Sequence, residues 1–411
     1  MAEARLVMIK IAVLGYGTVG SGVVEVLNTN QESINRKIGD EIEVKYVLDL
    51  RDFPEDPIQE KIVHDYDVIL KDEEIKIVVE VMGGVNPAYT FVKQALEAGK
   101  SVCTSNKELV AKHGAELLEI AHEKDINFLF EASVGGGIPI IRPLNCSLTS
   151  NEIEEITGIL NGTTNYIMSK MADEGSEFED VLKDAQDKGY AERNPEADVE
   201  GYDACRKIAI LSSLAFGNQV DYEDIYTEGI TKITAEDIKF AKKMGYSIKL
   251  LASSKKVENK FYAMVAPFLV PQTHPLYSVN GVFNGIFVHG NVLGDVMFYG
   301  SGAGKLPTAS AVVADVMDAA KHMHRSIMND WSSEKLELTS IDSAVRRFFI
   351  RANGTAADAA KLEAIFGKGD VVTVDGLDGE FGFVTAEMSE AEFSAKAAQT
   401  DMIKNRIRIE A

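Results

Sequence analysis

Four charged residues lie close together near the middle of the chain, within the stretch GYAERNPEADVEGYDACRK. Glu192 and Asp198 come first and are followed by Asp203 and Lys207. Asp203 and Lys207 are four residues apart, so on a helix their side chains share one face, and that face continues into the apolar Ile210. An acid beside a lysine at the edge of an apolar stripe suits general acid–base catalysis, because burial and a neighbouring carboxylate set the pKa of the lysine. The alternative is a solvated surface ion pair, which contributes little.

A glycine-rich turn follows an apolar run near the N-terminus. The turn reads Gly15-Tyr16-Gly17-Thr18-Val19-Gly20. This spacing fits a dinucleotide site, because Gly15 permits a tight turn, Gly17 lets the backbone approach a pyrophosphate, and Gly20 lets helix and strand pack closely. The helix N-terminus at Thr18 and Val19 would offer N–H groups to the phosphates. The alternative is a glycine turn without a ligand.

Two charged residues lie at the end of the second expected strand, Val44–Leu50, with Asp49 inside the strand and Arg51 directly after it. Asp49 lies where an acidic side chain can hold the ribose 2′-hydroxyl of NAD, whereas Arg51 could receive the 2′-phosphate of NADP. Both can equally be solvated loop charges. The choice between NAD and NADP therefore stays open.

Two further strand ends carry polar groups. Lys107, after Asn106, ends the fourth expected strand at the rim where ligands of such sheets lie; the alternative is an ordinary strand-end lysine. Glu131 precedes the glycine run Gly135–Gly137. A carboxylate beside free carbonyls could hold a hard monovalent cation, since such ions take oxygen ligands. The alternative here is a hinge between domains.

The elements around these residues alternate between strand and helix. Apolar runs such as Met8–Leu14 indicate strands buried on both faces. Alternating strands and helices predict an α/β fold with a doubly wound parallel sheet and ligands at the carboxyl ends of its strands. We expect a Rossmann domain over residues 1–142. A glycine-rich start and a helix over 305–330 indicate that the chain returns to this domain.

Two more domains are expected beyond residue 142. Residues 143–304 mix strands and helices and indicate a second, α+β domain. Residues 342–411 follow the order βαββαβ, which predicts a ferredoxin-like unit similar to small-molecule-sensing ACT domains. At 411 residues, the chain is long enough for several domains.

Composition narrows the class of protein. The net charge of -22 argues against nucleic acid or an anionic membrane as a partner. Neither a signal sequence nor an apolar run long enough to span a bilayer is evident. Three scattered cysteines, Cys103, Cys146 and Cys205, predict neither a disulfide framework nor a zinc site. We therefore expect a soluble protein of the reducing cytoplasm.

The motifs together resemble one enzyme family. GYGTVGSGV, TSNKELVA, EASVGGGIPII, GILNGTTNYI, GYAE…ADVEGYDACRKIAIL and GAGKLPTASAVVAD are similar, in this order, to the homoserine dehydrogenases, from about residue 8 to about residue 330. The resemblance implies interconversion of L-homoserine and L-aspartate 4-semialdehyde with NAD or NADP, on the route to threonine and methionine. It also implies a homo-oligomer, a dimer or a tetramer, with residues 143–304 as the substrate-binding and dimerisation domain.

The resemblance implies roles for the central residues. Glu192, beside Gly189, and Asp203 would bind the substrate through its ammonium group. Lys207 would move the hydroxyl proton. Asp198 matches a family acid whose role is less defined.

The resemblance also implies roles for residues of the nucleotide domain. Lys107 would polarise the carbonyl oxygen at the reacting carbon, and Gly302 and Gly304 of a second glycine element would touch the cofactor. The sodium site described in the family falls on Glu131 and the backbone carbonyls of Val134, Gly136 and Ile138.

Two departures from the family pattern keep alternatives open. The second strand ends in VLDLRD, which leaves NAD, NADP or dual use undecided. The tail reads Ala352-Asn-Gly-Thr-Ala where regulatory ACT domains carry DRPG, which argues against feedback by threonine.

Two other functions remain as alternatives. One is a non-catalytic dinucleotide or amino-acid sensor, and the other is an aspartate-semialdehyde dehydrogenase, which would need an activated cysteine.

Overall fold

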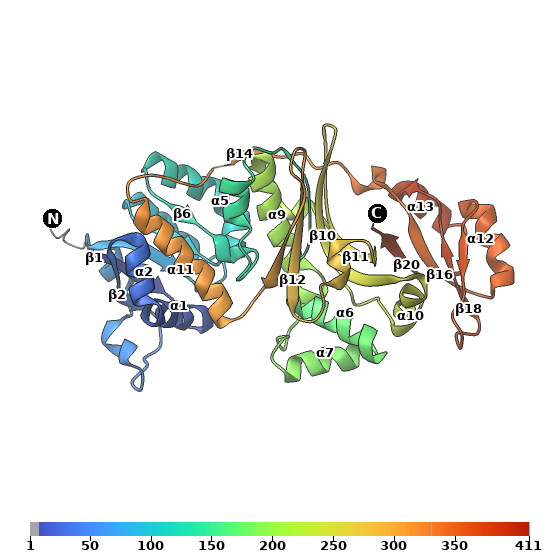
Figure 1. Ribbon diagram of the computed structural model, residues 1–411, viewed down its shortest axis with the longest axis horizontal. Coiled ribbons are helices and arrows are strands. Elements are labelled where there is room, and N and C mark those ends of the chain that lie inside the picture. Colours follow the sequence, from blue (N-terminus) through green and yellow to red (C-terminus); the bar gives the residue numbers. More distant parts are fainter. Residues whose placement is uncertain (1–7, 330, 411) are drawn as a thin grey trace. The chain divides into compact units, whose positions relative to one another are not determined.

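The computed structural model describes residues 8–329 and 331–410 of the chain. The prediction that the chain has no signal sequence concerns residues before Met8, which lie outside the described part. The chain divides into two compact units (Figure 1). The first unit contains residues up to 150 together with 209–221 and 300–336, and the second contains 151–208, 222–299 and the chain from 337 onward. None of the helices in the described part is both long and apolar enough to cross a membrane.

The first unit is built on a parallel six-stranded sheet with the order β3-β2-β1-β4-β5-β6. Its strands are β1 (Met8–Leu14), β2 (Glu41–Leu48), β3 (Ile62–Val63), β4 (Ile75–Glu80), β5 (Ser101–Thr104) and β6 (Phe128–Leu129). Every adjacent pair runs parallel. The last four residues of β1 and of β4 are buried, as strands covered on both faces require. The predicted parallel α/β sheet is confirmed.

Helices connect these strands. They are α1 (Thr18–Thr29), α2 (Gln31–Ile38), α3 (Tyr66–Leu70), α4 (Ala88–Glu97), α5 (Lys107–Glu123) and the later α11 (Lys305–Lys321). With α11 the chain returns to the first unit, and this helix packs along α1 (Figure 1). The packing is close, since a Cβ on Gly22 would lie 3.0 Å from the Cβ of Ala309.

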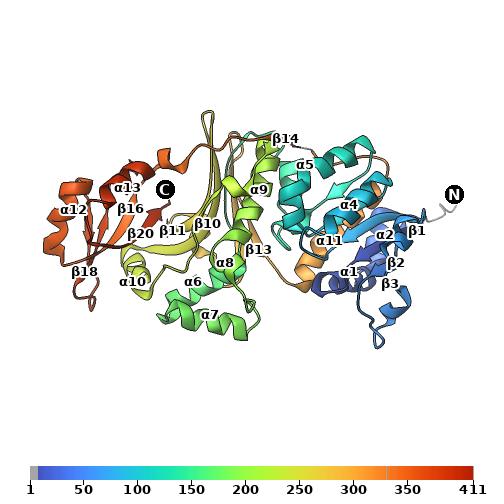
Figure 2. The ribbon, with the colours of Figure 1, turned by 180° about the vertical axis from the view of Figure 1, so that it is seen from behind.

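The second unit carries a largely antiparallel sheet. Its central strands are β7 (Ile153–Ile159), β10 (Tyr246–Val257), β11 (Lys260–Pro271), β12 (Phe283–Gly290) and β13 (Gly294–Ser301), in the order β13-β12-β7-β10-β11. Its helices are α6 (Gly162–Glu174), α7 (Phe178–Asp187), α8 (Glu196–Val199), α9 (Tyr202–Phe216), which continues past the boundary of the unit, and α10 (Ala235–Met244). Helices α6 and α7 lie side by side (Figure 2).

The tail forms a ferredoxin-like module, here called the C-terminal module (residues 348–409). Its elements are β16 (Phe348–Asn353), α12 (Ala359–Phe366), β17 (Asp370–Val372), β18 (Glu380–Val384), α13 (Glu390–Ala397) and β20 (Ile403–Ile409). The strands pair in the order β20-β16-β18-β17, and β20 also pairs in parallel with β11, so the module extends the central sheet. Its core includes Phe348, Phe381, Phe383 and Leu362. These elements follow the predicted βαββαβ order, and the likeness to ACT domains stays a prediction.

Short elements complete the fold. They are η1 (Pro57–Lys61), η2 (Glu131–Ser133), the π-helix η3 (Pro143–Ser147), β8 (Asn218–Gln219), η4 (Tyr222–Asp224), β9 (Tyr226–Thr227), η5 (Pro275–Ser278), β14 (Ser332–Lys335), η6 (Ile341–Ser343), β15 (Val345–Arg346), η7 (Ala356–Asp358) and β19 (Met388–Ser389).

Candidate functional site

The glycine turn has the geometry of a phosphate-binding turn. Gly15 has a φ of +98°, which side-chain-bearing residues rarely adopt. A Cβ on Gly20 would overlap the carbonyl oxygen of Gly15, so this position requires glycine. A Cβ on Gly17 would meet no protein atom within 4 Å, which means that Gly17 borders open space. These three observations fit a backbone that a pyrophosphate can approach at Gly17.

Helix α1 starts at the residues expected to bind the cofactor. It begins at Thr18, and its N-cap residue is Gly17, which has no side chain to cap the first N–H groups. Its first turn contains Val19 and no acidic residue. The positive end of the helix dipole therefore lies at this turn without a local carboxylate to neutralise it, as an anion-binding helix start requires.

Asp49 and Arg51 form a tight pair at the end of β2. Asp49 Oδ1 accepts hydrogen bonds from the backbone N and from Nε of Arg51, and Oδ2 accepts from Arg51 Nη2, each at 3.0 Å. The backbone N of Tyr16 also donates to Asp49 Oδ2 at 2.8 Å. The Arg51 bonds lower the pKa of Asp49. Asp49 thus ties the glycine turn to an exposed arginine.

A buried hydrogen-bond chain precedes Lys107, the first residue of α5. Glu80, at the end of β4, accepts from the backbone N of Met82 at 2.8 Å and from Thr104 Oγ1 at 2.6 Å. The backbone N of Asn106 donates to the same Thr104 hydroxyl at 2.9 Å. Asn106 is the N-cap of α5. Its side chain accepts from Leu109 N and donates to Gly84 O. Glu80 therefore positions the start of the helix that carries Lys107.

Glu80 was not singled out in the sequence. Glu80 is fully buried, and burial raises the pKa of its carboxyl group. An acid at the end of a strand, directly after three apolar residues, is the signal that could have identified it.

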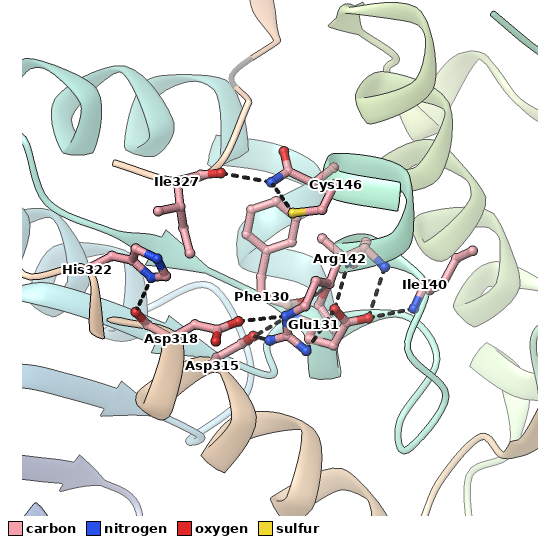
Figure 3. Close-up of polar contacts among 12 residues, drawn as sticks. Phe130, Glu131, Ile140, Arg142, Cys146, Asp315, Asp318, His322 and Ile327 are labelled. Atoms are coloured by element: carbon pink, nitrogen blue, oxygen red, sulfur yellow. Dashed lines mark hydrogen bonds and ion pairs between the residues drawn. The ribbon is translucent and has the colours of Figure 1, made fainter. Parts of the chain in front are cut away.

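Glu131 is held by donors from its own segment. Its Oε1 accepts from the backbone N of Ile140 at 2.6 Å and of Ile141 at 2.9 Å, and Oε2 accepts from the backbone N of Arg142 at 2.7 Å. Figure 3 shows the Glu131 carboxylate facing these groups, with the Arg142 guanidinium bonded to Asp315 and Asp318 at 2.7 Å each. The carboxylate thus holds the start of the turn over 140–147.

The loop after Glu131 contains the three backbone carbonyls that are expected to hold a cation. Gly136 has a φ of +57°, and a Cβ there would overlap the carbonyl oxygen of Gly302, so the loop packs on the second glycine element. In the described chain, no backbone N–H donates to the carbonyls of Val134, Gly136 or Ile138. These carbonyls fit a hard cation, whereas the Glu131 carboxylate already accepts three N–H groups. Within the described residues, no three His, Cys, Asp or Glu side chains form a metal-binding group.

The second glycine element leads into α11. Gly304 is the N-cap of this helix and has a φ of +121°. Gly302 precedes it and contacts the Gly136 loop, as described above. Both glycines therefore belong to the first unit, together with the Gly15–Gly20 turn.

In the second unit, Asp203 and Lys207 form a buried ion pair. Lys207 Nζ donates to Asp203 Oδ2 at 2.7 Å and to the carbonyl oxygen of Leu160 at 2.8 Å. The two residues are only 5% and 9% exposed. The surface ion pair considered from the sequence is therefore excluded, because a pair at this depth is shielded from water.

Asn161 joins this pair to Asp198. Its Nδ2 donates to Asp198 Oδ1 at 2.7 Å and to Asp203 Oδ2 at 2.9 Å. Its Oδ1 accepts from Thr164 N, so Asn161 is also the N-cap of α6. Sequence reasoning did not select Asn161. The signal was an asparagine directly after an apolar strand and before a helix, which is a common N-cap pattern.

Glu192 and Gly189 lie in the loop between α7 and α8. Gly189 has a φ of +74°. Glu192 is exposed, and Gln186 Nε2 donates to its backbone oxygen at 3.1 Å. In the described part of the chain its carboxylate is not bonded to the Asp198–Asp203–Lys207 group. The structure thus brings together three of the four charged residues with which the sequence analysis began.

Comparisons of sequence identify related proteins. A family model described as "Homoserine dehydrogenase, NAD binding domain" matches residues 15–131, and one described as "Homoserine dehydrogenase" matches residues 139–317. The homoserine dehydrogenase of Bacillus subtilis (strain 168) is 40% identical over 407 residues, covering 94% of this chain and 93% of the relative.

Comparisons of structure agree. A homoserine dehydrogenase from Thiobacillus denitrificans superposes with a TM-score of 0.90 at 37% identity, covering 98% of this chain and 99% of that one. A hyperthermophilic archaeal homoserine dehydrogenase in complex with NADPH gives a TM-score of 0.66 at 28% identity and covers 76% of this chain and 98% of that one.

Proposed function

The chain belongs to the homoserine dehydrogenase family, and from this premise we propose a role for each part of its candidate site. The enzyme is an NAD(P)-dependent oxidoreductase that interconverts L-homoserine and L-aspartate 4-semialdehyde, on the route to threonine and methionine. The observation that carries the assignment of roles is the buried group of Asn161, Asp198, Asp203 and Lys207.

Cofactor binding is assigned to the first unit. The backbone at Gly17 and the start of α1 at Thr18 and Val19 would hold the pyrophosphate, and Gly15 and Gly20 would keep the turn in shape. The open space at Gly17 supports this assignment. Gly302 and Gly304 would contact the cofactor from the second glycine element.

Substrate chemistry is assigned to charged side chains. A bound nicotinamide supplies the hydride acceptor for oxidation of L-homoserine. Lys207 takes the hydroxyl proton as general base, and Lys107 stabilises the developing carbonyl oxygen. Asp203 and Glu192 bind the substrate ammonium through charge-assisted hydrogen bonds, with Asp198 and Gly189 completing that part of the site.

The Asp49–Arg51 pair is proposed to set cofactor preference. Asp49 alone would favour the ribose 2′-hydroxyl of NAD and repel a 2′-phosphate. Arg51 offsets that charge through its contacts at 3.0 Å and is exposed, so it can turn toward a phosphate. We therefore expect the enzyme to use both cofactors, with Arg51 responsible for the use of NADP.

A sodium ion is proposed at the loop after Glu131. The carbonyls of Val134, Gly136 and Ile138 would hold it, since oxygen ligands suit such an ion. Glu131 would supply charge nearby and keep the loop in shape. Comparing thermal stability in equal concentrations of sodium, potassium and tetramethylammonium chloride tests this site. Stabilisation by sodium alone supports it, and equal melting temperatures would remove it.

A homo-oligomer is also proposed. Several large apolar side chains on or next to β12 and β13 are exposed, namely Phe283, Val292, Leu293 and Tyr299. Contact with a second copy of the chain would bury them. A dimer or tetramer mass in light scattering is the expected result. The cytoplasm remains the predicted location.

The cysteines of the chain argue against the alternative function of an aspartate-semialdehyde dehydrogenase. An aspartate-semialdehyde dehydrogenase needs an activated cysteine. Cys103 and Cys205 are buried, and burial raises the pKa of the Cys103 thiol well above its usual range. Cys146 is exposed. Turnover that survives alkylation of Cys146 would exclude thiol catalysis there.

The assay at 340 nm tests the function directly. The purified protein is mixed with L-homoserine and either NAD or NADP at mildly alkaline pH. Reduction of both cofactors is expected. Binding of cofactor without reduction would instead support a sensor.

A further inference from the structure

The C-terminal module carries a buried arginine that faces two carboxylates. Arg408, on β20, is 1% exposed. It makes a two-pronged contact with Glu390 of the same module, with Nε to Oε1 at 2.6 Å and Nη2 to Oε2 at 3.0 Å. Its remaining nitrogen, Nη1, donates to Glu228 Oε2 at 2.7 Å. Glu228 lies outside the module, so this arginine links the module to the rest of the second unit.

Glu228 begins a segment that lies directly on the end of α8. The next residue is Gly229, where a Cβ would overlap the carbonyl oxygen of Val199 and lie 2.5 Å from Cα of Glu200. The backbone N of Ile230 donates to the same Val199 oxygen at 2.8 Å. The segment and the end of α8 are therefore in backbone contact, with no room for a side chain between them.

The end of α8 is one residue from the substrate group. Asp198 precedes Val199, and its carboxylate accepts from Asn161. The turn after it, at Gly201, has a φ of +85°, and a Cβ there would lie 3.1 Å from a side-chain carbon of Val265 and 3.2 Å from one of Thr227. This turn leads into α9 and Asp203. A displacement of the segment at Glu228 would thus shift the turn that connects the helices carrying these two carboxylates.

We infer that Glu228 is a positioning residue, through which the C-terminal module fixes the turn between Asp198 of α8 and Asp203 of α9. The inference rests on the proposed function, because it treats these carboxylates as substrate-binding groups. The module lies outside the residues that the family models match. Its contact through Arg408 therefore reaches Glu228, which lies within the matched residues, from outside them.

The second contact of the module provides a contrast. Arg351 of β16 contacts Asp237 of α10 at 2.8 Å, and Asn405 donates to Asp237 at 2.7 Å. This contact also joins the module to the rest of the second unit, but it leads to α10 and not to the Glu228 segment. If both contacts served only stability, loss of either contact should affect KM for L-homoserine equally. If Glu228 positions the turn, only loss of the Glu228 contact should raise this KM.

The test compares two isosteric variants of the full-length enzyme. Glu228→Gln and Glu390→Gln each remove one carboxylate partner of Arg408, but only Glu228 touches the segment on α8. We expect Glu228→Gln to raise KM for L-homoserine by about 3- to 30-fold with an unchanged dissociation constant for the cofactor. Glu390→Gln should lower the melting temperature and leave this KM within about 2-fold of wild type. Equal increases of KM in both variants, or no increase in Glu228→Gln, would overturn the inference.

A second variant and a second readout keep the test independent of folding and of turnover. Gly229→Ala forces the segment away from Val199 without removing any ion pair, and it should raise the same KM. Amide hydrogen exchange over residues 196–207 should be faster in Glu228→Gln and Gly229→Ala than in Glu390→Gln. This exchange can be measured even if wild-type protein fails to oxidise homoserine, so failure of the proposed function and failure of the positioning role give different results. Equal exchange in all three variants would contradict the role.

Discussion

The two units of the chain carry candidate sites of different kinds. In the first unit, the candidate cofactor site consists of backbone. Gly17 leaves open space, Gly20 leaves no room for a Cβ, and the start of α1 supplies N–H groups. In the second unit, the candidate substrate site consists of side chains, with Asn161 bonded to two carboxylates and Lys207 bonded to one of them. We expect the glycine turn to bind the pyrophosphate through shape and helix dipole, and the second group to bind substrate through charge.

This difference has a consequence for mutational sensitivity. A backbone site fails when atoms are added, because the phosphate needs close approach. A charged side-chain site fails when atoms are removed, because the partners left behind are buried and unsatisfied. The two kinds of change should therefore separate cofactor binding from turnover.

The largest effect is expected at Lys207. Lys207→Ala should lower kcat by at least ~100-fold, because general acid–base help is lost. The dissociation constant for NAD or NADP, measured by quenching of protein fluorescence, should remain at the wild-type value. The control is Lys170→Met, which removes a lysine of α6 that is paired with Asp184 of α7. This variant should keep kcat within about 2-fold of wild type. Loss of cofactor binding in Lys207→Ala would contradict the assignment of cofactor binding to the first unit and of proton transfer to the second.

A pair of glycine variants tests the backbone part. Gly20→Ala must displace the backbone of Gly15 and should destabilise the protein by about 1–3 kcal/mol while weakening cofactor binding. Gly17→Ala meets no protein atom within 4 Å. It should keep the wild-type melting temperature yet weaken cofactor binding by about 10-fold or more, because its Cβ enters the space of the pyrophosphate. Calorimetry and titration measure the two quantities. Unchanged affinity in Gly17→Ala would show that the cofactor does not approach this turn.

A smaller effect is expected at Arg51. Arg51→Ala leaves the Asp49 carboxylate without its guanidinium, which should repel a 2′-phosphate. The ratio of kcat/KM for NADP to that for NAD should fall by about 10-fold. Arg36→Ala, at the end of α2, is a control for the loss of one positive charge from this unit. An equal fall in that control would show that total charge, rather than the Asp49–Arg51 pair, sets the preference.

The smallest effect is expected from the hydrogen-bond chain before Lys107. Thr104→Val keeps the shape of the side chain but removes the hydroxyl between Glu80 and Asn106. Losing these bonds should cost about 1–3 kcal/mol of stability and lower kcat by about 3- to 10-fold through displacement of α5. Steady-state kinetics and thermal unfolding together check this. A loss of stability with an unchanged kcat would show that these hydrogen bonds serve stability and do not position Lys107.

The sequence predicted those features that depend on neighbours along the chain. The glycine turn spans six consecutive residues, and Asp203 and Lys207 are one helical turn apart, so local spacing alone was informative. The parallel sheet was predicted for the same reason, since apolar runs and helices alternate regularly. The roles assigned to Glu192, Gly189 and the Glu131 loop remain predictions.

Other features depend on contacts between distant residues and gave no such signal. Asn161 bonds to Asp203 across 42 positions, and Glu80 bonds to Thr104 across 24. Their polar side chains matter because the fold buries them beside one another, and burial depends on how β7, α6 and α9, or β4 and β5, come together. The link from Arg408 to Glu228 spans 180 positions and depends on the pairing of β20 with β11.

The most direct test of the central claim, that Lys207 transfers the proton, is chemical rescue of Lys207→Ala. The oxidation of L-homoserine by this variant is followed at 340 nm with increasing concentrations of small primary amines. We predict that the rate rises with amine concentration and depends on the pKa of the amine, as expected for a general base that replaces the lost one. A rate that does not respond to any amine, in a variant that still binds cofactor and L-homoserine, would contradict the assignment of proton transfer to Lys207.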